Sequence, residues 1–203
     1  MQAAPNNAQI AIIDGGGANI ASLKFALARL GCDAQLTTDA ATIEAATHVI
    51  LPGVGAAADS MRRLREAGLI ELIPRLRQPF LGICLGLQLL FEASDENDAE
   101  CLGIFGGRAR LFDATPDQPV PHMGWNRVAY TRESSLLDGI PEGSHFYFVH
   151  SYALDVTVDT LATSNYGRDF TAIVERDNFA AAQFHPERSG ELGARLLQNF
   201  LSQ

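Results

Sequence analysis

A cysteine between two glycines is the residue of this chain best placed to do covalent chemistry. Gly82-Ile83-Cys84-Leu85-Gly86 has the G-x-S-x-G spacing of a nucleophile elbow, with cysteine in place of serine. In such an elbow a strand turns sharply into a helix, and small residues two positions before and after the nucleophile avoid clashes. The helix N-terminus favours the thiolate, and the N–H of Leu85 is expected to point toward the reacting centre. The pattern therefore predicts a nucleophile rather than an inert, buried thiol.

A thiolate also needs a partner that can protonate the leaving group, and a positioned histidine can do this. His185 ends the apolar segment FAAAQF, and Glu187 follows two residues later. A carboxylate there can hold the imidazole in one tautomer and support its charged form. We therefore expect Cys84, His185 and Glu187 to form a triad. The other histidines are given no catalytic role: His48, His122, His145 and His150. His48 and His122 are interpreted as structural or interfacial.

Glycines after a second apolar run offer donors for an oxyanion. The segment LPGVG, residues 51–55, ends a predicted strand next to the elbow, and glycines let backbone N–H groups turn toward a ligand. An ordinary loop is the alternative interpretation of this segment. Gly15-Gly16-Gly17 resembles a phosphate-binding turn, but it lacks the full G-x-G-x-x-G spacing and no suitable acidic residue ends the second predicted strand. No nucleotide cofactor is expected.

The first half of the chain alternates the two periodicities that could position these groups. Apolar runs predict strands at 9–14, 33–38, 48–52 and 79–84. Helical spacing predicts helices at 18–30, 41–46, 56–77 with a break near Gly68, and from residue 85 through LGLQLLFEA. Such alternation indicates a parallel sheet covered on both faces, with ligand sites beyond the carboxyl ends of its strands.

The second half is rich in strands and ends in a helix. Strand-like segments lie at 108–112, 126–130, 145–154, 160–166, 170–176 and 179–184, and 189–202 reads as an amphipathic helix. We therefore predict an α/β fold of three layers, with a central mixed, mainly parallel sheet and a strand-rich C-terminal half. The chain shows no linker, repeat or low-complexity stretch, so residues 1–203 are expected to form a single domain.

The bulk composition excludes several classes of protein. Fifteen Lys and Arg against 24 Asp and Glu give a net charge of −9, which repels nucleic acids and anionic membrane surfaces. Three cysteines, at positions 32, 84 and 101, have neither the number of a disulfide framework nor the spacing of a metal site. The N-terminus lacks the features of a signal peptide, and no run of about 18 apolar residues occurs. We expect a soluble, cytoplasmic protein without metal.

Five motifs together resemble those of the class I glutamine amidotransferases, most closely the glutaminase subunits of imidazole glycerol phosphate synthase in histidine biosynthesis. They are PGVG at 52–55, GICLGLQ at 82–88, HMGWN at 122–126, YFVHSY at 147–152 and FHPERSG at 184–190. The resemblance covers nearly the whole chain and implies a flavodoxin-like fold. It departs from the family pattern in the first loop, where Gly15 and Ala18 stand, and at Ala57 and Arg188.

The resemblance implies a glutaminase mechanism. Cys84 would attack the side-chain amide of glutamine and form a glutamyl thioester, His185 would protonate the departing ammonia and then activate water, and Glu187 would orient His185. Backbone N–H groups of Gly53, Val54 and Leu85 would bind the oxyanion. Glutamine would be held by Gly55, Gln88, Ser151 and Tyr152.

The resemblance also implies a partner. Free ammonia becomes ammonium at neutral pH and loses its nucleophilicity, so direct transfer to a second active site is favourable. The partner would be a (βα)8-barrel cyclase that makes imidazole glycerol phosphate and an aminoimidazole carboxamide ribotide, and the isolated subunit would be nearly idle. The partner interface would contain His122, Met123, Gly124, Trp125 and Asn126.

Three alternatives stay open from the sequence. Another class I glutaminase, such as the one that feeds pyridoxal phosphate synthesis, would share the triad. A cysteine peptidase or esterase would use the same elbow but needs an open cleft. In a non-catalytic interaction module Cys84 would be inert.

Overall fold

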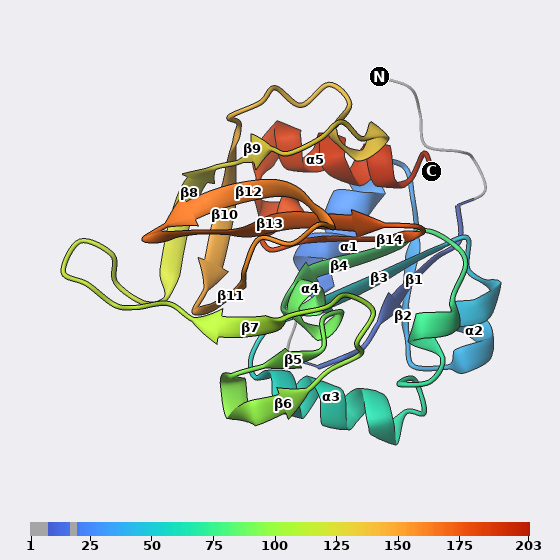
Figure 1. Ribbon diagram of the computed structural model, residues 1–203. Helices are drawn as coiled ribbons and strands as arrows, with labels where there is room; N and C mark the ends of the chain where they lie inside the picture. The colour runs from blue at the N-terminus through green and yellow to red at the C-terminus, as the bar shows by residue number, and fades with distance from the viewer. Residues whose placement is uncertain (1–7, 17–19) are drawn as a thin grey trace.

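An eight-stranded sheet runs through the computed structural model, which describes residues 8–16 and 20–203 (Figure 1). Its strand order is β2-β1-β3-β4-β14-β13-β12-β9. The first five strands of this order are parallel: β2 (Ala34–Thr37), β1 (Ile10–Ile13), β3 (His48–Gly53), β4 (Phe80–Cys84) and β14 (Phe179–Ala182). The other three are antiparallel: β13 (Arg168–Arg176), β12 (Thr160–Tyr166) and β9 (Ala129–Tyr130). The prediction of a mixed, mainly parallel sheet is confirmed.

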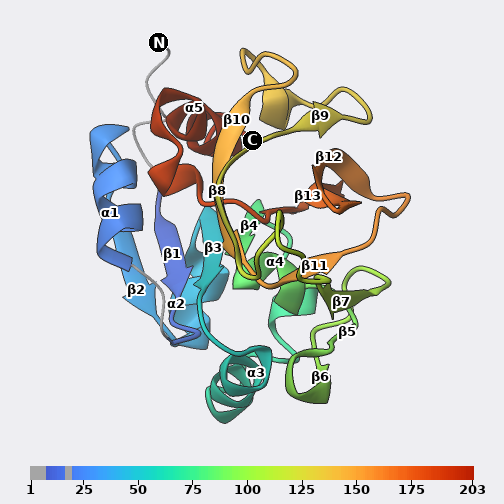
Figure 2. The ribbon, with the colours of Figure 1, turned by 90° about the vertical axis from the view of Figure 1, so that its left-hand side faces the viewer.

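The central strands are apolar along their whole length because both faces of the sheet are covered. Successive side chains of a strand point to opposite faces, and accordingly Ile10 and Ile12 lie in one core while Ala11 and Ile13 lie in the other. Helices α1 (Ile20–Arg29) and α5 (Gly190–Phe200) cover the first face, and α2 (Ala40–Ala45) and α3 (Ala57–Glu66) cover the second (Figures 1 and 2). The three-layer α/β fold is confirmed.

Two smaller sheets extend the C-terminal half beyond the central sheet (Figure 2). An antiparallel ribbon consists of β8 (His122–Arg127) and β10 (His145–His150). The second sheet has the order β11-β7-β5-β6, with bounds Tyr152–Leu154, Arg108–Leu111, Ala93–Ser94 and Ala99–Glu100. These pieces lie on the side of the sheet where β4 ends, so they can form walls around the elbow.

Several predicted elements differ from the structure. The segment 145–154 is two strands in different sheets, separated by Ser151. Strand β8 begins at His122 rather than at residue 126, and β5 and β6 were not predicted. The helix after the elbow, α4, covers only Leu85–Leu89. It stops because the carbonyls of Leu89 and Leu90 accept hydrogen bonds from the N–H groups of residues 102, 104 and 105 rather than from a further helical turn.

The helix predicted at 56–77 divides where expected. Helix α3 ends at Glu66, and Gly68 follows with a φ of 72°, the left-handed conformation typical of a residue after a helix C-terminus. A short 3-10 helix, Ile73–Arg75, completes the segment. The N-terminal residues 1–7 and the loop departure at Ala18, with the predicted start of the first helix, lie outside the described residues. Within the described ranges, no helix has the length and apolar character needed to cross a bilayer.

Candidate active site

Three strand ends bring the predicted residues together at one edge of the sheet. Cys84 is the last residue of β4, with Gly53 of β3 opposite it. On the other side of β4, Ile83 pairs with Ala182 of β14, so the segment that leads to His185 continues past the same edge. Cys84 has φ 55° and ψ −109°, an unusual backbone conformation for a residue with a side chain. Such strain is what a sharp strand-to-helix elbow requires.

The glycines of the elbow are needed because the backbone is crowded. A Cβ atom on Gly86 would lie 1.8 Å from the carbonyl oxygen of Leu51, and a Cβ on Gly82 would lie 2.8 Å from the carbonyl oxygen of Gly86. Real Cβ atoms essentially never approach other heavy atoms this closely. The close contact of α4 with both β3 and β4 therefore explains the G-x-C-x-G spacing of this sequence.

His185 and Glu187 form a buried pair beyond the end of β14. His185 Nδ1 lies 2.8 Å from Glu187 Oε1, and the two side chains are 8% and 6% exposed. Because the carboxylate accepts, Nδ1 carries a proton and Nε2 remains for another partner. The backbone is held as well: the N–H of His185 donates to the carbonyl of Tyr147, and Ser189 Oγ donates to the carbonyl of His185.

The protonation of His185 depends on its two neighbours. Burial disfavours the charged imidazole, but hydrogen bonding and charge interaction with Cys84 and with Glu187 outweigh this cost and raise the pKa of His185 to about 10. Among the described residues no atom makes a hydrogen bond of ordinary geometry with Nε2. The imidazole is therefore electrostatically coupled to the Cys84 sulfur, with Nε2 available to a reacting group.

A pocket of about 280 Å³ opens onto Cys84. Its lining includes most of the predicted oxyanion and substrate residues: Val54, Gly55, Leu85, Gln88, Ser151 and Tyr152. Gly53 lines a much smaller cavity of about 10 Å³ beside His185 and Glu187. Larger hollows of about 560, 660 and 930 Å³ lie elsewhere and are not lined by Cys84 or His185.

Besides Val149 and His150, which line the pocket from within the YFVHSY motif, two residues of this site were not predicted from the sequence. Glu96 lines the pocket, and its Oε2 accepts from the N–H of Ala57 at the start of α3, at 2.8 Å. Gln183 is fully buried, and its Nε2 lies 3.8 Å from the Cys84 sulfur. Gln183 Oε1 in turn accepts from Gln88 Nε2. No motif singles out either residue; a polar residue inside the apolar run FAAAQF is the one signal that could have found Gln183.

The ribbon strand β8 presents two exposed apolar side chains. Met123 is 64% exposed and Trp125 is 57% exposed, so Trp125 is not a core aromatic. Of residues 122–126, which are predicted to lie at a partner surface, not all expose their side chains, because side chains alternate along the strand. His122 is buried, and Gly124 and Asn126 are half-buried. Trp125 packs edge-to-face on Tyr147 of β10. The Arg188 guanidinium lies over the same Tyr147 ring.

The side chains that meet at this site are of the types needed for acyl transfer. A nucleophile, an imidazole that can carry a proton and a carboxylate that orients it are the three parts such chemistry requires. In the described ranges, no three His, Cys, Asp or Glu side chains come together as metal ligands. All three cysteines are free.

The comparisons with known proteins agree with this chemistry. The family model for the class I glutamine amidotransferases matches residues 11–203. The chain is 53% identical over 192 residues to the imidazole glycerol phosphate synthase subunit HisH of Xanthomonas axonopodis pv. citri, a match that covers 95% of this chain and 96% of the relative. It is also 53% identical over 193 residues to the HisH subunit of Xylella fastidiosa, with the same coverage.

Solved structures show a similar fold. A crystal structure of a glutamine amidotransferase superposes with a TM-score of 0.72 at 19% identity and covers 95% of this chain and 96% of that chain. The structure of PurLQS from Thermotoga maritima gives a TM-score of 0.71 at 18% identity, with 96% and 97% covered. At these identities the likeness is one of fold.

Proposed function

The chain belongs to the class I glutamine amidotransferases and, within them, to the family of imidazole glycerol phosphate synthase subunit HisH, and on this basis we propose that it is the glutaminase subunit of such a synthase. It hydrolyses glutamine to glutamate and ammonia and passes the ammonia to a cyclase subunit. The observation that carries the proposal is the meeting of Cys84 with the His185–Glu187 pair at the end of β4, in a chain 53% identical to HisH subunits. A peptidase or esterase is not favoured by this family membership.

The chemistry proceeds through a covalent intermediate. The Cys84 thiolate attacks the side-chain amide carbon of glutamine, and the C=O electron pair moves onto the oxygen. As the tetrahedral intermediate collapses, the C–N bond breaks and His185 Nε2 delivers a proton to the nitrogen, so that ammonia leaves and a glutamyl thioester remains. Water then adds with His185 as the base, and glutamate and the thiolate are released. Glu187 holds the imidazole with Nε2 facing the sulfur.

Backbone donors stabilise the negative oxygen. We assign this role to the N–H of Leu85, at the first position after the elbow, and to those of Gly53 and Val54, at the end of β3. In support, Val54 and Leu85 line the pocket with Cys84, and Gly53 lies opposite Cys84 in the sheet. Backbone N–H groups that point at this oxygen stabilise the charge that develops on it in the transition state.

The pocket beside Cys84 holds the rest of the glutamine molecule. Gly55, Gln88, Ser151 and Tyr152 bind its polar groups, and the half-buried carboxylate of Glu96 is placed to pair with the α-ammonium. Glu96 is anchored to α3 through the N–H of Ala57, which fixes one of its oxygens and leaves the other free for a ligand.

The exposed face of β8 receives the cyclase. We infer that Met123 and Trp125 dock on a (βα)8-barrel subunit, which accepts ammonia before it becomes ammonium in water. Large apolar side chains exposed side by side on a strand are what a protein interface needs. We also propose that residues 1–203 act as one amidotransferase domain in the cytoplasm.

Labelling by an electrophile that mimics glutamine tests the proposal. Burial raises the pKa of Cys101 to about 11, and burial together with Asp33 raises the pKa of Cys32. Both thiols are therefore less reactive near neutral pH than a cysteine with an unperturbed pKa. We expect the label on Cys84, with loss of glutamate release in the presence of the cyclase. Labelling at Cys32 or Cys101, or undiminished glutamate release after full labelling of Cys84, would contradict the proposed function.

A further inference from the structure

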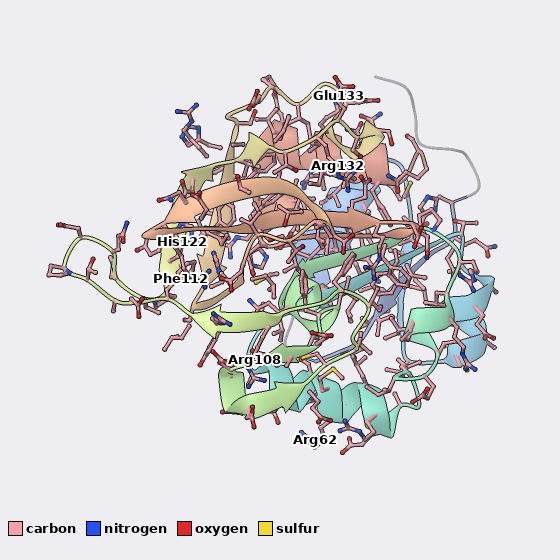
Figure 3. The ribbon with its side chains drawn as sticks, in the orientation of Figure 1. Arg62, Arg108, Phe112, His122, Arg132 and Glu133 are labelled. Carbon is pink, nitrogen blue, oxygen red and sulfur yellow. The ribbon has the colours of Figure 1, made fainter. Side chains whose placement is uncertain are left out.

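Two histidines that the mechanism does not use lie back to back inside the β8–β10 ribbon. His122 and His150 occupy paired positions of the antiparallel strands, and His122 Nδ1 lies 2.9 Å from His150 Nε2. Both side chains are buried and surrounded by aromatic rings; Figure 3 shows His122 near Phe112. The rings in contact with one or both histidines are Phe112, Phe148, Tyr166 and Phe170.

The pair is the middle of a longer chain of hydrogen bonds. At the inner end, His150 Nδ1 lies 2.8 Å from the carbonyl oxygen of Tyr152. At the outer end, Asn126 Nδ2 lies 3.3 Å from His122 Nε2 and donates to the carbonyl of Asn165 at 2.8 Å. The orientation of the Asn126 amide is fixed, because its Oδ1 accepts from the N–H of Arg127.

The chain fixes the tautomer of both rings. A carbonyl only accepts, so His150 Nδ1 carries the proton and, in the neutral ring, Nε2 accepts. His122 Nδ1 must then donate to it, which leaves His122 Nε2 as the acceptor for Asn126 Nδ2. All donors and acceptors are matched in this single arrangement of two neutral rings. An added proton on either ring would place two donors face to face.

Burial keeps the rings neutral. It lowers the pKa of His122 to about 4. It lowers the pKa of His150 to about 3, with small contributions from His122, His185 and Arg168 against the opposing hydrogen bond to Tyr152. Two phenylalanines would fill this aromatic cluster without any polar group to desolvate. The fold therefore maintains a polar connection where an apolar one would suffice for packing.

The inner end of the chain reaches the nucleophile. The Tyr152 carbonyl that accepts from His150 also accepts from Gln88 Nε2, at 3.0 Å. Gln88 Nε2 lies 3.1 Å from Gln183 Oε1, and Gln183 Nε2 lies 3.8 Å from the Cys84 sulfur. The outer end lies on β8, where exposed Met123 and Trp125 alternate with inward-facing His122. Strand β8 thus carries both the exposed face proposed for docking and the outer end of this series of hydrogen bonds.

We propose that His122 and His150 form a relay of fixed tautomers that ties the position of β8 to Tyr152, Gln88 and the glutamine pocket. Both are proposed to act by positioning: His122 lies behind His150, and His150 lines the pocket that opens onto Cys84. A displacement of β8 on docking of the cyclase is transmitted to the pocket because the matched donors and acceptors leave only one arrangement. This inference rests on the proposed glutaminase function and names residues through which the partner acts on it.

Variants at His122 test the relay. In His122→Asn the amide nitrogen stands near the position of Nδ1 and can still donate to His150 Nε2. His122→Phe keeps a ring in the stack but leaves that acceptor unpaired. Tyr166→Phe is the matched control, because it keeps the ring stacked on His122 and removes only a hydroxyl that donates to the Pro119 carbonyl.

The readouts are the KM for glutamine and the stimulation of glutamate release by the cyclase, with ammonia-dependent synthesis as reference. We expect His122→Phe to raise the KM, or reduce the stimulation, by about tenfold, the size of a lost buried hydrogen bond. His122→Asn should recover most of the loss, and Tyr166→Phe should behave as wild type. His122→Phe with wild-type KM and stimulation would overturn the relay.

Nitrogen NMR of the wild-type protein gives an independent test if a variant fails to fold. Both histidines should show a protonated Nδ1 and an unprotonated Nε2 at neutral pH. An Nε2–H tautomer or a doubly protonated ring at either position would overturn the relay. Absence of glutamine turnover by the wild-type complex would instead contradict the proposed function, so the two failures are distinguishable.

Discussion

His185 Nδ1 and Glu187 Oε1 lie 2.8 Å apart in a buried pair whose imidazole faces Cys84. Because Cys84 and Glu187 raise the pKa of His185 from 6.5 to about 10, the folded protein holds this proton more tightly than the unfolded chain. The resulting stabilisation is fully present below pH 6.5 and is lost as the pH rises through about 10. We predict that the difference in the free energy of unfolding between wild type and His185→Asn shrinks across this interval. Urea titrations at several pH values measure it; a constant difference would contradict the raised pKa.

Cys84→Ala separates the two half-reactions. Without the sulfur no thioester forms, so glutamine-dependent synthesis by the assembled pair should fall by at least about 10³-fold. Synthesis with added ammonium salt should remain near the wild-type rate, because the cyclase does not use Cys84. Parallel assays with glutamine and ammonia measure both, and equal loss of the two activities would argue against the division of labour.

Glu187→Gln tests the orienting carboxylate. The amide is nearly isosteric, but it removes the charge that supports protonated His185 and can stabilise the wrong tautomer. We expect glutamine turnover to fall between about 10²- and 10⁴-fold and the pKa of His185 to decrease. Histidine NMR titration and steady-state kinetics provide the two measurements. A turnover within a few-fold of wild type would mean that Glu187 does not orient the imidazole.

Gly86→Ala tests the crowding at the elbow. The added methyl would lie 1.8 Å from the Leu51 carbonyl oxygen, so the backbone of α4 or β3 must shift. We expect a loss in the free energy of unfolding of about 3 kcal/mol or more. Gly106→Ala is the control, because its Cβ meets no atom within 4 Å and its φ is not positive; its effect should stay within about 1 kcal/mol. Similar losses in both variants would disprove the steric explanation.

Trp125→Ala tests the docking face. Removal of a large exposed aromatic from the centre of an interface typically costs about 2 kcal/mol of binding free energy. We therefore expect the affinity for the cyclase subunit to fall by that amount, measured by calorimetry with both purified subunits. Val158→Ala, at a valine 96% exposed in the turn before β12, should leave the affinity unchanged. Unchanged binding by Trp125→Ala would remove β8 from the interface.

The sequence was most informative where local pattern and packing agree. The parallel strands β1, β3, β4 and β14 are mainly apolar because both faces of the sheet are covered there, so the sequence predicted them directly. The elbow glycines are required by backbone contacts around Cys84. The segment 145–154 was predicted as one strand because apolar and aromatic residues occur on both sides of Ser151, where the chain changes sheets. A change of sheet depends on long-range pairing that no short window of sequence contains.

The position of Glu96 in the pocket could not be predicted from the sequence for the same reason. Glu96 begins a short 3-10 helix, Glu96–Asp98, which is held by pairing of Arg108 with Asp95 and Asp98 and by the contact of the Glu96 carboxylate with the start of α3. Each of these contacts joins segments at least ten residues apart. The burial of His122 likewise depends on which face of β8 meets the aromatic cluster, and a motif alone does not determine that face.

The alternation along β8 also has a practical consequence for engineering. Its outward side chains, Met123 and Trp125, are separate in space from those that face inward. To make this subunit bind a different synthase, one could therefore substitute Met123 and Trp125 alone and leave His122 unchanged.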